Sequence, residues 1–220
     1  MSAPETVLFD LDGTLTDPFI GITRSMRHAI EHVGYQAPAA EDLARWIGPP
    51  LRLTFRAVLE SEEEELIERA VAAYRQRYFD VGYLENTLYP GVADLLSTLR
   101  RRDLRLYIVT SKVEPLARMI MEHFALDGEF AGIHGTEMGG RLDDKSDLMR
   151  EMMAGEGIDN ESAVMIGDTR FDMIAARTCG VRSIGVTYGY GSPEELLTHG
   201  AAALCDTPME IGQRLEEMTA

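Results

Sequence analysis

The sequence predicts an α/β fold, a Rossmann-like doubly wound parallel sheet core with an inserted all-helical cap domain. Two observations lead to this fold class. Short apolar runs alternate with helical patterns through most of the chain, which is typical of a parallel sheet covered by helices on both faces. Between about residues 18 and 88 the strand pattern disappears and only helical patterns remain, which indicates a helical insertion.

The core elements follow in chain order. Strands are expected near Thr6–Phe9, Leu104–Val109, Phe130–His134, Ala163–Ile166 and Ser183–Val186. Helices are expected between them over Val92–Arg102, Glu114–Phe124, Lys145–Gly155 and Phe171–Cys179. Another helix is expected to begin at Ser192-Pro193, because a capping Ser precedes a Pro in the first turn. A final helix over Pro208–Met218 is expected to pack on the sheet edge.

The inserted segment contains four helical patterns, over Ile20–Val33, Glu41–Ile47, Leu51–Leu59 and Glu62–Tyr78. We therefore predict a Rossmann-like core from residues 1–16 and 89–220 and a helical cap from residues 17–88. Thr16-Asp17-Pro18 and Tyr89-Pro90-Gly91 are the expected hinges. A helical insertion after the first strand belongs over the strand ends, where a lid excludes water and limits substrates to small molecules.

Two acidic clusters follow predicted strands. The first strand leads into Asp10-Leu11-Asp12-Gly13-Thr14, and a later strand leads into Gly167-Asp168, with Asp172 about one helical turn further on. Ligands of open α/β sheets bind at the carboxyl ends of the strands. Carboxylates this close repel each other unless a cation lies between them, and Mg²⁺ takes oxygen ligands. The clusters therefore predict one anionic metal pocket.

Two further segments supply groups suited to phosphate. Thr110 and Ser111 follow the strand predicted to end at Val109, and a hydroxyl followed by N–H groups entering a helix can cradle a phosphate. Lys145 stands before the helical run that begins at Leu148. In an acidic pocket that must bind phosphate a fixed cation is needed, and lysine binds phosphate as a point charge.

These residues resemble the four motifs of the haloacid dehalogenase superfamily of phosphotransferases, and the resemblance covers the whole chain. Asp10-Leu11-Asp12-Gly13-Thr14 matches the first motif, Thr110 the second, Lys145 the third, and Gly167-Asp168 through Asp172 the fourth. Within the superfamily the chain most resembles the phosphoglycolate-phosphatase-like branch, and the segments 46–51 and 184–191 are similar to members described as 5′-nucleotidase-like. One departure is Ser146, because many relatives have Pro directly after the third-motif lysine.

The resemblance implies Mg²⁺-dependent hydrolysis of a small phosphate monoester through an aspartyl-phosphate. Asp10 would be the nucleophile. Asp12 would protonate the leaving alkoxide and then deprotonate the hydrolytic water, which contributes about 10²–10⁴-fold. Mg²⁺ would be held by the carboxylates of Asp10 and Asp168 and the backbone carbonyl of Asp12. Asp172 would hold a metal-bound water or orient Lys145.

Substrate binding is expected to draw on both parts of the chain. The phosphoryl group would be bound by Thr110, the N–H of Ser111 and Lys145. Discrimination between substrates is expected largely from the cap, since a carboxylate or second phosphate on the substrate needs a cation. The candidate cations are Arg45, Arg52 and Lys112.

The composition and charge of the chain limit the classes of molecule that it is expected to bind. The net charge is −16 and the isoelectric point about 4.7, and such a surface repels phosphate polymers, which argues against nucleic-acid binding. Neither Cys179 nor Cys205 lies in a Cys-x-x-Cys pattern. The chain has no apolar run of the ~20 residues that a membrane span needs and no signal-peptide pattern, so a cytoplasmic location is expected. A monomer or a homodimer is expected.

Several other functions use similar residues. A phosphomutase would carry the same motifs and return the phosphoryl group to substrate rather than to water. A receiver-type phospho-acceptor switch also places acids, a Thr and a Lys at strand ends, but the helical insertion and the order Asp-x-Asp-Gly-Thr disfavour it. A dehalogenase attacks carbon without a metal, and Asp12 and Asp168 argue against that reaction.

Overall fold

A computed structural model of the protein describes residues 3–138 and 141–218. The chain divides into two compact units, one comprising Met1–Asp17 and Leu88–Ala220 and the other Pro18–Thr87.

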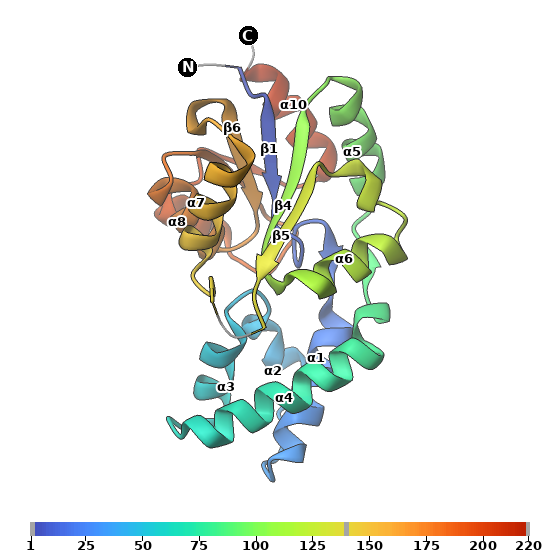
Figure 1. Ribbon diagram of the computed structural model, residues 1–220, viewed down its shortest axis with the longest axis vertical. Helices are drawn as coiled ribbons and strands as arrows, with labels where there is room; N and C mark the ends of the chain where they lie inside the picture. The colour runs from blue at the N-terminus through green and yellow to red at the C-terminus, as the bar shows by residue number, and fades with distance from the viewer. Residues whose placement is uncertain (1–2, 139–140, 219–220) are drawn as a thin grey trace. The chain divides into compact units, whose positions relative to one another are not determined.

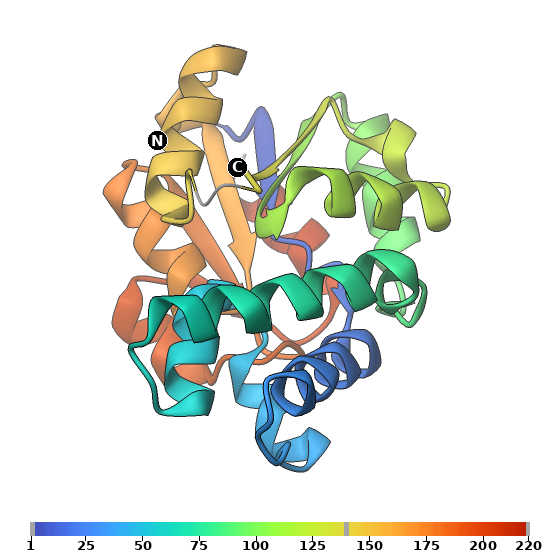
Figure 2. The same cartoon turned by 60° about the horizontal axis from the view of Figure 1, so that its bottom comes forward.

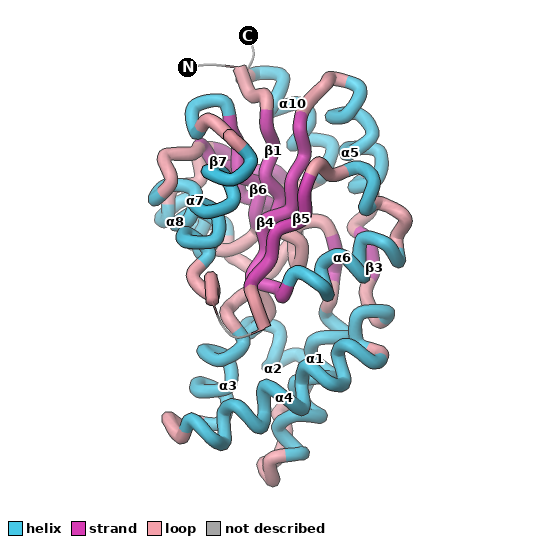
Figure 3. Tube along the Cα trace, in the orientation of Figure 1, coloured by secondary structure: helices cyan, strands magenta, loops and turns pink. Residues whose placement is uncertain are grey.

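The larger unit is built on a six-stranded parallel sheet, visible as the magenta strands of Figure 3. Its order is β5-β4-β1-β6-β7-β8. The strands are β1 (Thr6–Phe9), β4 (Arg105–Val113), β5 (Gly132–Thr136), β6 (Ala163–Gly167), β7 (Arg182–Val186) and β8 (Ala203–Cys205). A separate two-stranded sheet consists of β2 (Thr16–Asp17) and β3 (Thr87–Leu88).

Helices cover both faces of the six-stranded sheet. From β1 the chain passes through β4 to β5, then returns across β1 to β6, β7 and β8. Because parallel crossovers are right-handed, this reversal sends the connecting helices to opposite faces. In Figures 1 and 2, α7 and α8 lie on one side and α5 and α6 on the other. The helices are α5 (Val92–Arg101), α6 (Glu114–His123), α7 (Lys145–Glu156), α8 (Arg170–Thr178), α9 (Pro193–His199) and α10 (Pro208–Glu217).

Side-chain alternation along the strands divides the core between the two faces. Leu8 of β1 belongs to a buried cluster with α7 and α8, whereas its neighbours Val7 and Phe9, also fully buried, point to the opposite face. The cluster consists of Leu8, Tyr107, Val109, Leu148, Met149, Met152, Met153, Ile158, Ala163, Met165, Ala175, Ala176 and Val181. Burial on both faces explains why these strands read as continuous apolar runs.

The smaller unit is helical, as the cyan segments of Figure 3 show. Its long helices α1 and α4 pack against each other, and α3 packs against α4. Fully or nearly fully buried side chains, among them Met26, Phe55, Ile67 and Tyr78, form its own core. Its helices are α1 (Phe19–His32), α2 (Ala40–Leu43), α3 (Leu51–Leu59) and α4 (Glu64–Asp80), with the 3₁₀ turns η1 (Ala44–Trp46) and η2 (Gly82–Leu84).

The predicted fold class is confirmed, because a parallel sheet with helices on both faces carries an all-helical insertion. Some elements differ from the prediction. β8, with only three residues, was not predicted, since so short a run carries no periodicity. β4 continues to Val113, four residues beyond the predicted end. Near residue 44 the predicted helix tightens into the 3₁₀ turn η1.

The order of the strands in the sheet also indicates where a ligand would bind. The chain reverses direction across the sheet at β1, which lies between β4 and β6. In open α/β sheets such a switch point opens a crevice at the carboxyl ends of the strands. Asp10 follows β1, Thr110 lies near the end of β4 and Asp168 follows β6, so three separated segments converge there.

Candidate active site

The loop after β1 is a tight turn that buries Asp10. The Leu11 N–H donates to Asp10 Oδ1 at 2.7 Å, and the Leu11 carbonyl accepts from the N–H groups of Leu15 and Thr16 at 2.9 and 3.0 Å. Gly13 has a φ of +88°, and a Cβ built there would lie 2.1 Å from Asp168 Oδ2. Glycine is therefore needed at this position for both its backbone conformation and its size.

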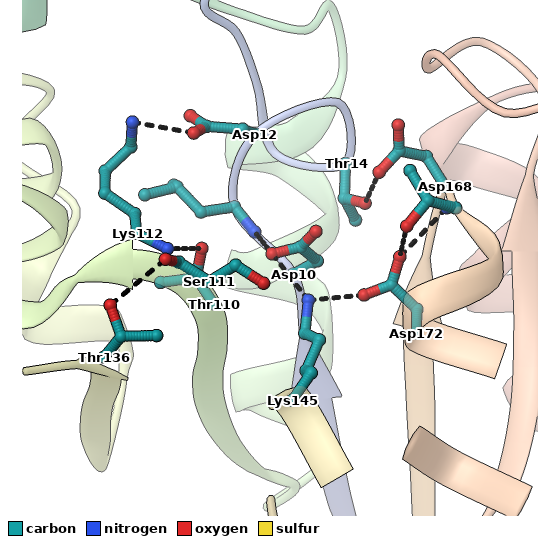
Figure 4. Close-up of polar contacts among 12 residues, drawn as sticks. Asp10, Asp12, Thr14, Thr110, Ser111, Lys112, Thr136, Lys145, Asp168 and Asp172 are labelled. Atoms are coloured by element: carbon teal, nitrogen blue, oxygen red, sulfur yellow. Dashed lines mark hydrogen bonds and ion pairs between the residues drawn. The ribbon is translucent and has the colours of Figure 1, made fainter. Parts of the chain in front are cut away.

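Lys145 begins α7 and points into the cluster (Figure 4). Its Nζ lies 2.9 Å from Asp10 Oδ1 and also contacts Asp172 Oδ1. Burial works against the charged ammonium, but the neighbouring Asp10 and Asp172 carboxylates outweigh it and raise the pKa of Lys145 above its ordinary value. The lysine is therefore a fixed cation beside Asp10 and Asp172, and its role in phosphate binding stays a prediction.

The helix cap beside Lys145 explains the departure at Ser146. The Asp144 side chain accepts from the N–H groups of Ser146 and Asp147, at 2.8 and 3.3 Å. A proline at 146 has no N–H and would lose the shorter of these bonds. In this chain the cap holds the first turn of α7, and with it the backbone of Lys145.

Asp168 and Asp172 have different surroundings although both are fully buried. Asp168 accepts from the Thr14 hydroxyl at 3.2 Å and from the Tyr190 N–H at 2.8 Å. Asp172 Oδ2 accepts from both the N–H and the hydroxyl of Thr169, at 2.9 and 2.8 Å, in a capping box, while its Oδ1 contacts Lys145. Both oxygens of Asp172 are thus engaged, which suits it to orienting Lys145.

The cluster carries excess negative charge. One carboxylate oxygen from each of Asp10, Asp168 and Asp172 lies within 4.8 Å of the others, and all three residues are buried. Burial and then Asp172 raise the pKa of Asp10 to about 7, against the opposing effect of Lys145. Burial and the neighbouring Asp172 and Asp10 carboxylates raise the pKa of Asp168 well above its ordinary value. Such repulsion is relieved by a cation placed among the carboxylates.

Asp12 lies apart from the three clustered acids. The Lys112 Nζ is 2.7 Å from Asp12 Oδ2, and both side chains are largely buried. Asp12 Oδ1 is buried with no hydrogen-bond partner among the described residues. Lys112 was predicted as a substrate-binding cation, and the structure shows it paired with Asp12.

The local structure at Thr110 and Ser111, the predicted phosphate cradle, differs from the predicted strand end followed by a helix. Both residues lie inside β4, because the strand runs on to Val113 and α6 begins at Glu114. The register against β5 shifts between Thr110 and Val113, so this stretch is bulged. Thr110 Oγ1 accepts from the Lys112 N–H at 3.2 Å, and the Ser111 carbonyl accepts from the Thr136 hydroxyl at 3.2 Å. Any cradle here is therefore formed by a bulge and not by a helix N-terminus.

The remaining predicted site residues, Arg45 and Arg52, lie in the helical unit. Arg45 is exposed on η1. The Arg52 Nε donates to Glu68 Oε1 at 2.5 Å, and this bond lowers the pKa of Glu68. A role for either arginine in substrate binding stays a prediction.

The segment after β7 also belongs to the site, and it was not predicted from the sequence. The Tyr190 N–H binds Asp168, and the Tyr188 hydroxyl donates to the Thr14 carbonyl at 3.0 Å. A Cβ at Gly189 would lie 2.3 Å from the Asp168 Cβ, and a Cβ at Gly191 would lie 2.1 Å from the Asp168 carbonyl oxygen. The signal in the sequence was the Tyr-Gly-Tyr-Gly pattern shortly after a strand, which served there only to support a resemblance.

Comparison with known proteins identifies the family. Residues 7–186 match the sequence profile of the haloacid dehalogenase-like hydrolases. The chain belongs to this family. A 5′-nucleotidase of Pseudomonas aeruginosa is 41% identical over 210 residues, which span 96% of this chain and 95% of that protein. A predicted phosphatase from Clostridium acetobutylicum has a crystal structure that superposes with a TM-score of 0.95 at 37% identity, covering 98% of this chain and 100% of that one.

Two other relatives of this hydrolase carry different names. The tyrosine-protein kinase PtkA of Mycobacterium tuberculosis is 38% identical over 189 residues, which are 86% of this chain and 64% of that protein. Phosphoglycolate phosphatase 1 of Pseudomonas aeruginosa is 31% identical over 221 residues, covering 98% and 78% respectively.

The comparisons confirm the predicted superfamily and the predicted class of enzyme, a phosphatase of the haloacid dehalogenase type. Both branch names suggested by the sequence, 5′-nucleotidase and phosphoglycolate phosphatase, occur among the relatives. In the part of the chain that the structure describes, no helix combines the length and the apolar character that a membrane crossing requires.

Proposed function

We propose that this hydrolase cleaves a small phosphate monoester with the help of Mg²⁺, through a phosphoryl group carried on Asp10. The observation that carries the proposal is the charge of the buried cluster. Among the described residues, three carboxylates, of Asp10, Asp168 and Asp172, face the one ammonium of Lys145. The excess of two negative charges matches a divalent cation.

The donor set also fits the chemistry of Mg²⁺, a hard ion that protein sites bind through one or two carboxylates, with substrate phosphate and water completing the shell. Asp172 is committed to Lys145 and Thr169, so Asp10 and Asp168 are the carboxylates that would hold the ion, together with the backbone carbonyl of Asp12. When bound, Mg²⁺ neutralises charge on the substrate phosphate and so allows an anionic nucleophile to approach.

The residues of the chain can perform the two half-reactions. The Asp10 side chain makes its described contacts through Oδ1, to Leu11 and Lys145, and we assign Oδ2 to the attack on phosphorus. The P–O bond to the leaving group breaks, and Asp12 donates a proton to the departing alkoxide from its unpartnered Oδ1. Asp12 then takes a proton from the water that attacks the phosphorylated Asp10, which releases phosphate and restores the carboxylate.

Other residues would hold the phosphoryl group. Lys145 is a fixed donor beside Asp10, held by Asp172 and by the capped start of α7. We assign the Thr110 hydroxyl and the Ser111 N–H to the remaining phosphoryl oxygens, because both lie in the bulge of β4, the strand next to β1. Lys112 would hold Asp12 on one oxygen so that the other faces the leaving group.

For the substrate we propose a nucleoside 5′-monophosphate first and phosphoglycolate second. This order follows the names of relatives that are 41% and 31% identical over nearly the whole chain. The helical unit would act as a cap that selects among small esters, with Arg45 and Arg52 as candidate cations.

A second candidate is transfer of the phosphoryl group to an acceptor other than water. The similarity to a protein named as a tyrosine kinase favours it, and a phosphomutase would use the same residues. In either case Asp10 would still be the group that carries phosphate.

The test is phosphate release from a panel of nucleoside monophosphates, phosphoglycolate and hexose phosphates, with Mg²⁺ and with excess chelator. We expect release only with Mg²⁺, the highest kcat/KM for a nucleoside monophosphate, and none from Asp10→Asn. Release that survives chelation, or an active Asp10→Asn enzyme, would contradict the proposal. Isomerisation of a hexose phosphate without release would favour the mutase.

A further inference from the structure

The segment Tyr188-Gly189-Tyr190-Gly191 packs its backbone against Asp168. The Tyr190 N–H donates to Asp168 Oδ2 at 2.8 Å, and the Gly191 N–H donates to the Asp168 carbonyl at 3.1 Å. Neither glycine has room for a side chain. A Cβ at Gly189 would lie 2.5 Å from the Gly13 carbonyl oxygen, and a Cβ at Gly191 would lie 2.1 Å from the Asp168 carbonyl oxygen. The two glycines therefore permit a close backbone approach to a carboxylate that we assign to the metal.

The two tyrosines of this segment reach away from Asp168. The Tyr188 hydroxyl donates to the Thr14 carbonyl at 3.0 Å, and the Thr14 hydroxyl in turn donates to Asp168 Oδ1 at 3.2 Å. The Tyr190 hydroxyl donates to Asp17 Oδ1 at 2.5 Å. Burial, and then the bond to Asp17, raise the pKa of the Tyr190 hydroxyl far above its ordinary value, so it remains a donor.

Asp17 occupies a particular place in the chain. It is the last residue of the first core segment, directly before the helical unit that begins at Pro18. On the return path the Tyr89 N–H donates to the Leu15 carbonyl at 3.1 Å, and the Tyr89 ring packs edge-on against Tyr188 with centroids 4.9 Å apart. Both connections to the helical unit are thus in contact with the elements that hold Asp168.

We propose that Tyr190 is a positioning residue that fixes Asp168 for metal binding by anchoring its own backbone N–H through the hydroxyl bond to Asp17. The inference rests on the proposed function, because it takes Asp168 to be a metal ligand. Partners that orient a ligand in this way affect metal affinity, and the direct ones typically do so by about 10–100-fold. Tyr190 acts through one further hydrogen bond, so its effect on metal affinity should lie below that of a direct partner.

The test is Mg²⁺ binding to chelator-treated protein, measured by calorimetry, alongside kcat and KM. Tyr190→Phe removes the hydroxyl but keeps the backbone N–H, and we expect a Kd for Mg²⁺ about three- to tenfold weaker, with little change in substrate KM at saturating Mg²⁺. The matched control is Tyr107→Phe, which also removes a hydroxyl bound to a carboxylate, Glu156 at 3.3 Å, in the same unit. The control should leave the Kd for Mg²⁺ unchanged.

A double-mutant cycle tests the link to Asp17. Asp17→Ala should weaken Mg²⁺ binding by as much as Tyr190→Phe does. The double variant should have the same Kd for Mg²⁺ as either single variant, because both changes remove the same hydrogen bond. Asp17→Asn keeps an acceptor oxygen and should bind Mg²⁺ nearly as the wild type does. A Tyr190→Phe protein with wild-type Mg²⁺ affinity, or fully additive effects in the cycle, would overturn the inference.

Failure of this inference is distinct from failure of the proposed function. A wild-type protein that binds Mg²⁺ but releases phosphate from no ester would refute the function, while the affinities still test Tyr190. A protein that releases phosphate, with Tyr190→Phe and Tyr107→Phe equal in Mg²⁺ affinity, would refute only the role of Tyr190. A wild-type protein that binds no Mg²⁺ would refute both.

Discussion

Replacing Lys145 with methionine removes the positive charge that faces Asp10 and Asp172 inside the core. The lysine side chain is 4% exposed, and the two carboxylate side chains are 7% and 0% exposed, so water does not screen the change. Methionine is unbranched and fills much of the same space. The substitution therefore acts mainly by leaving buried carboxylates without their counter-charge.

The loss of unfolding free energy can be estimated from what the carboxylates can do without Lys145, which is to stay charged and unpaired or to take up a proton. Removing one partner of a buried ion pair typically costs about 3–5 kcal/mol. A carboxyl can instead take up a proton, and at pH 7, from an ordinary pKa of 3.8, this costs at most about 4 kcal/mol, at 1.36 kcal/mol per pH unit. We therefore expect Lys145→Met to lose about 3–4 kcal/mol of unfolding free energy at pH 7 in chelator.

Protonation of the carboxylates also fixes the sign of the pH dependence of stability. A carboxyl whose pKa is raised on folding binds more protons in the folded than in the unfolded protein, so stability falls as the pH rises towards the folded pKa. At pH 5 the cost of protonation is at most about 2 kcal/mol, and the deficit of Lys145→Met should shrink to about that value. Saturating Mg²⁺ should also restore part of the stability, but not the activity, since Lys145 is assigned to phosphate.

The assay is urea unfolding of wild type and Lys145→Met at pH 5 and pH 7, with chelator and with Mg²⁺. Lys112→Met is the matched control, because Lys112 is similarly buried, 6% exposed, yet is placed against Asp12 rather than the cluster. Its loss should be smaller and should respond less to Mg²⁺. Equal losses for the two variants, or a Lys145→Met deficit that grows at pH 5, would refute the reasoning.

Two further predictions concern the backbone of the site. Gly13→Ala should lower kcat/KM at least tenfold and weaken Mg²⁺ binding, because its Cβ would lie 2.1 Å from Asp168 Oδ2. Gly34→Ala is its control, with a similar φ of +92° and open space around it, and should lose only the strain, about 1–2 kcal/mol by thermal unfolding, with activity kept. Asp144→Ala should cost about 1 kcal/mol in urea unfolding through loss of the α7 cap. An unchanged midpoint for Asp144→Ala would show that the cap is not needed.

Parts of the fold and the site could be predicted from the sequence wherever the residues that indicate them lie within a few positions of each other. The β1 run and the two acids that follow it are contiguous, so a strand and its carboxyl-end loop could be recognised together. Asp168 and Asp172 are one helical turn apart and could be predicted as a pair for the same reason. Lys145 could be named by its motif position, although nothing near it in the sequence shows that it is buried.

The contacts that complete the site are long-range, and no local pattern specifies them. Thr14 and Asp168 are 154 positions apart, and Tyr190 and Asp17 are 173 apart. The pairing of Lys112 with Asp12 could not be read from the sequence either, because an exposed lysine and a buried one look the same there. The extension of β4 through its bulge depends on hydrogen bonding to β5, which the strand propensity of the individual residues does not reveal.

The sequence by itself determined the fold class, the order of the strands along the chain and the residue types that stand at their carboxyl ends, because hydrophobic periodicity and turn residues are local properties. Only the tertiary structure decided which groups contact the oxygens of each carboxylate, which lysine faces which acid, and that the Tyr190 N–H binds Asp168. Those facts depend on the order of strands across the sheet, which brings β1, β4 and β6 together and buries their ends in one place.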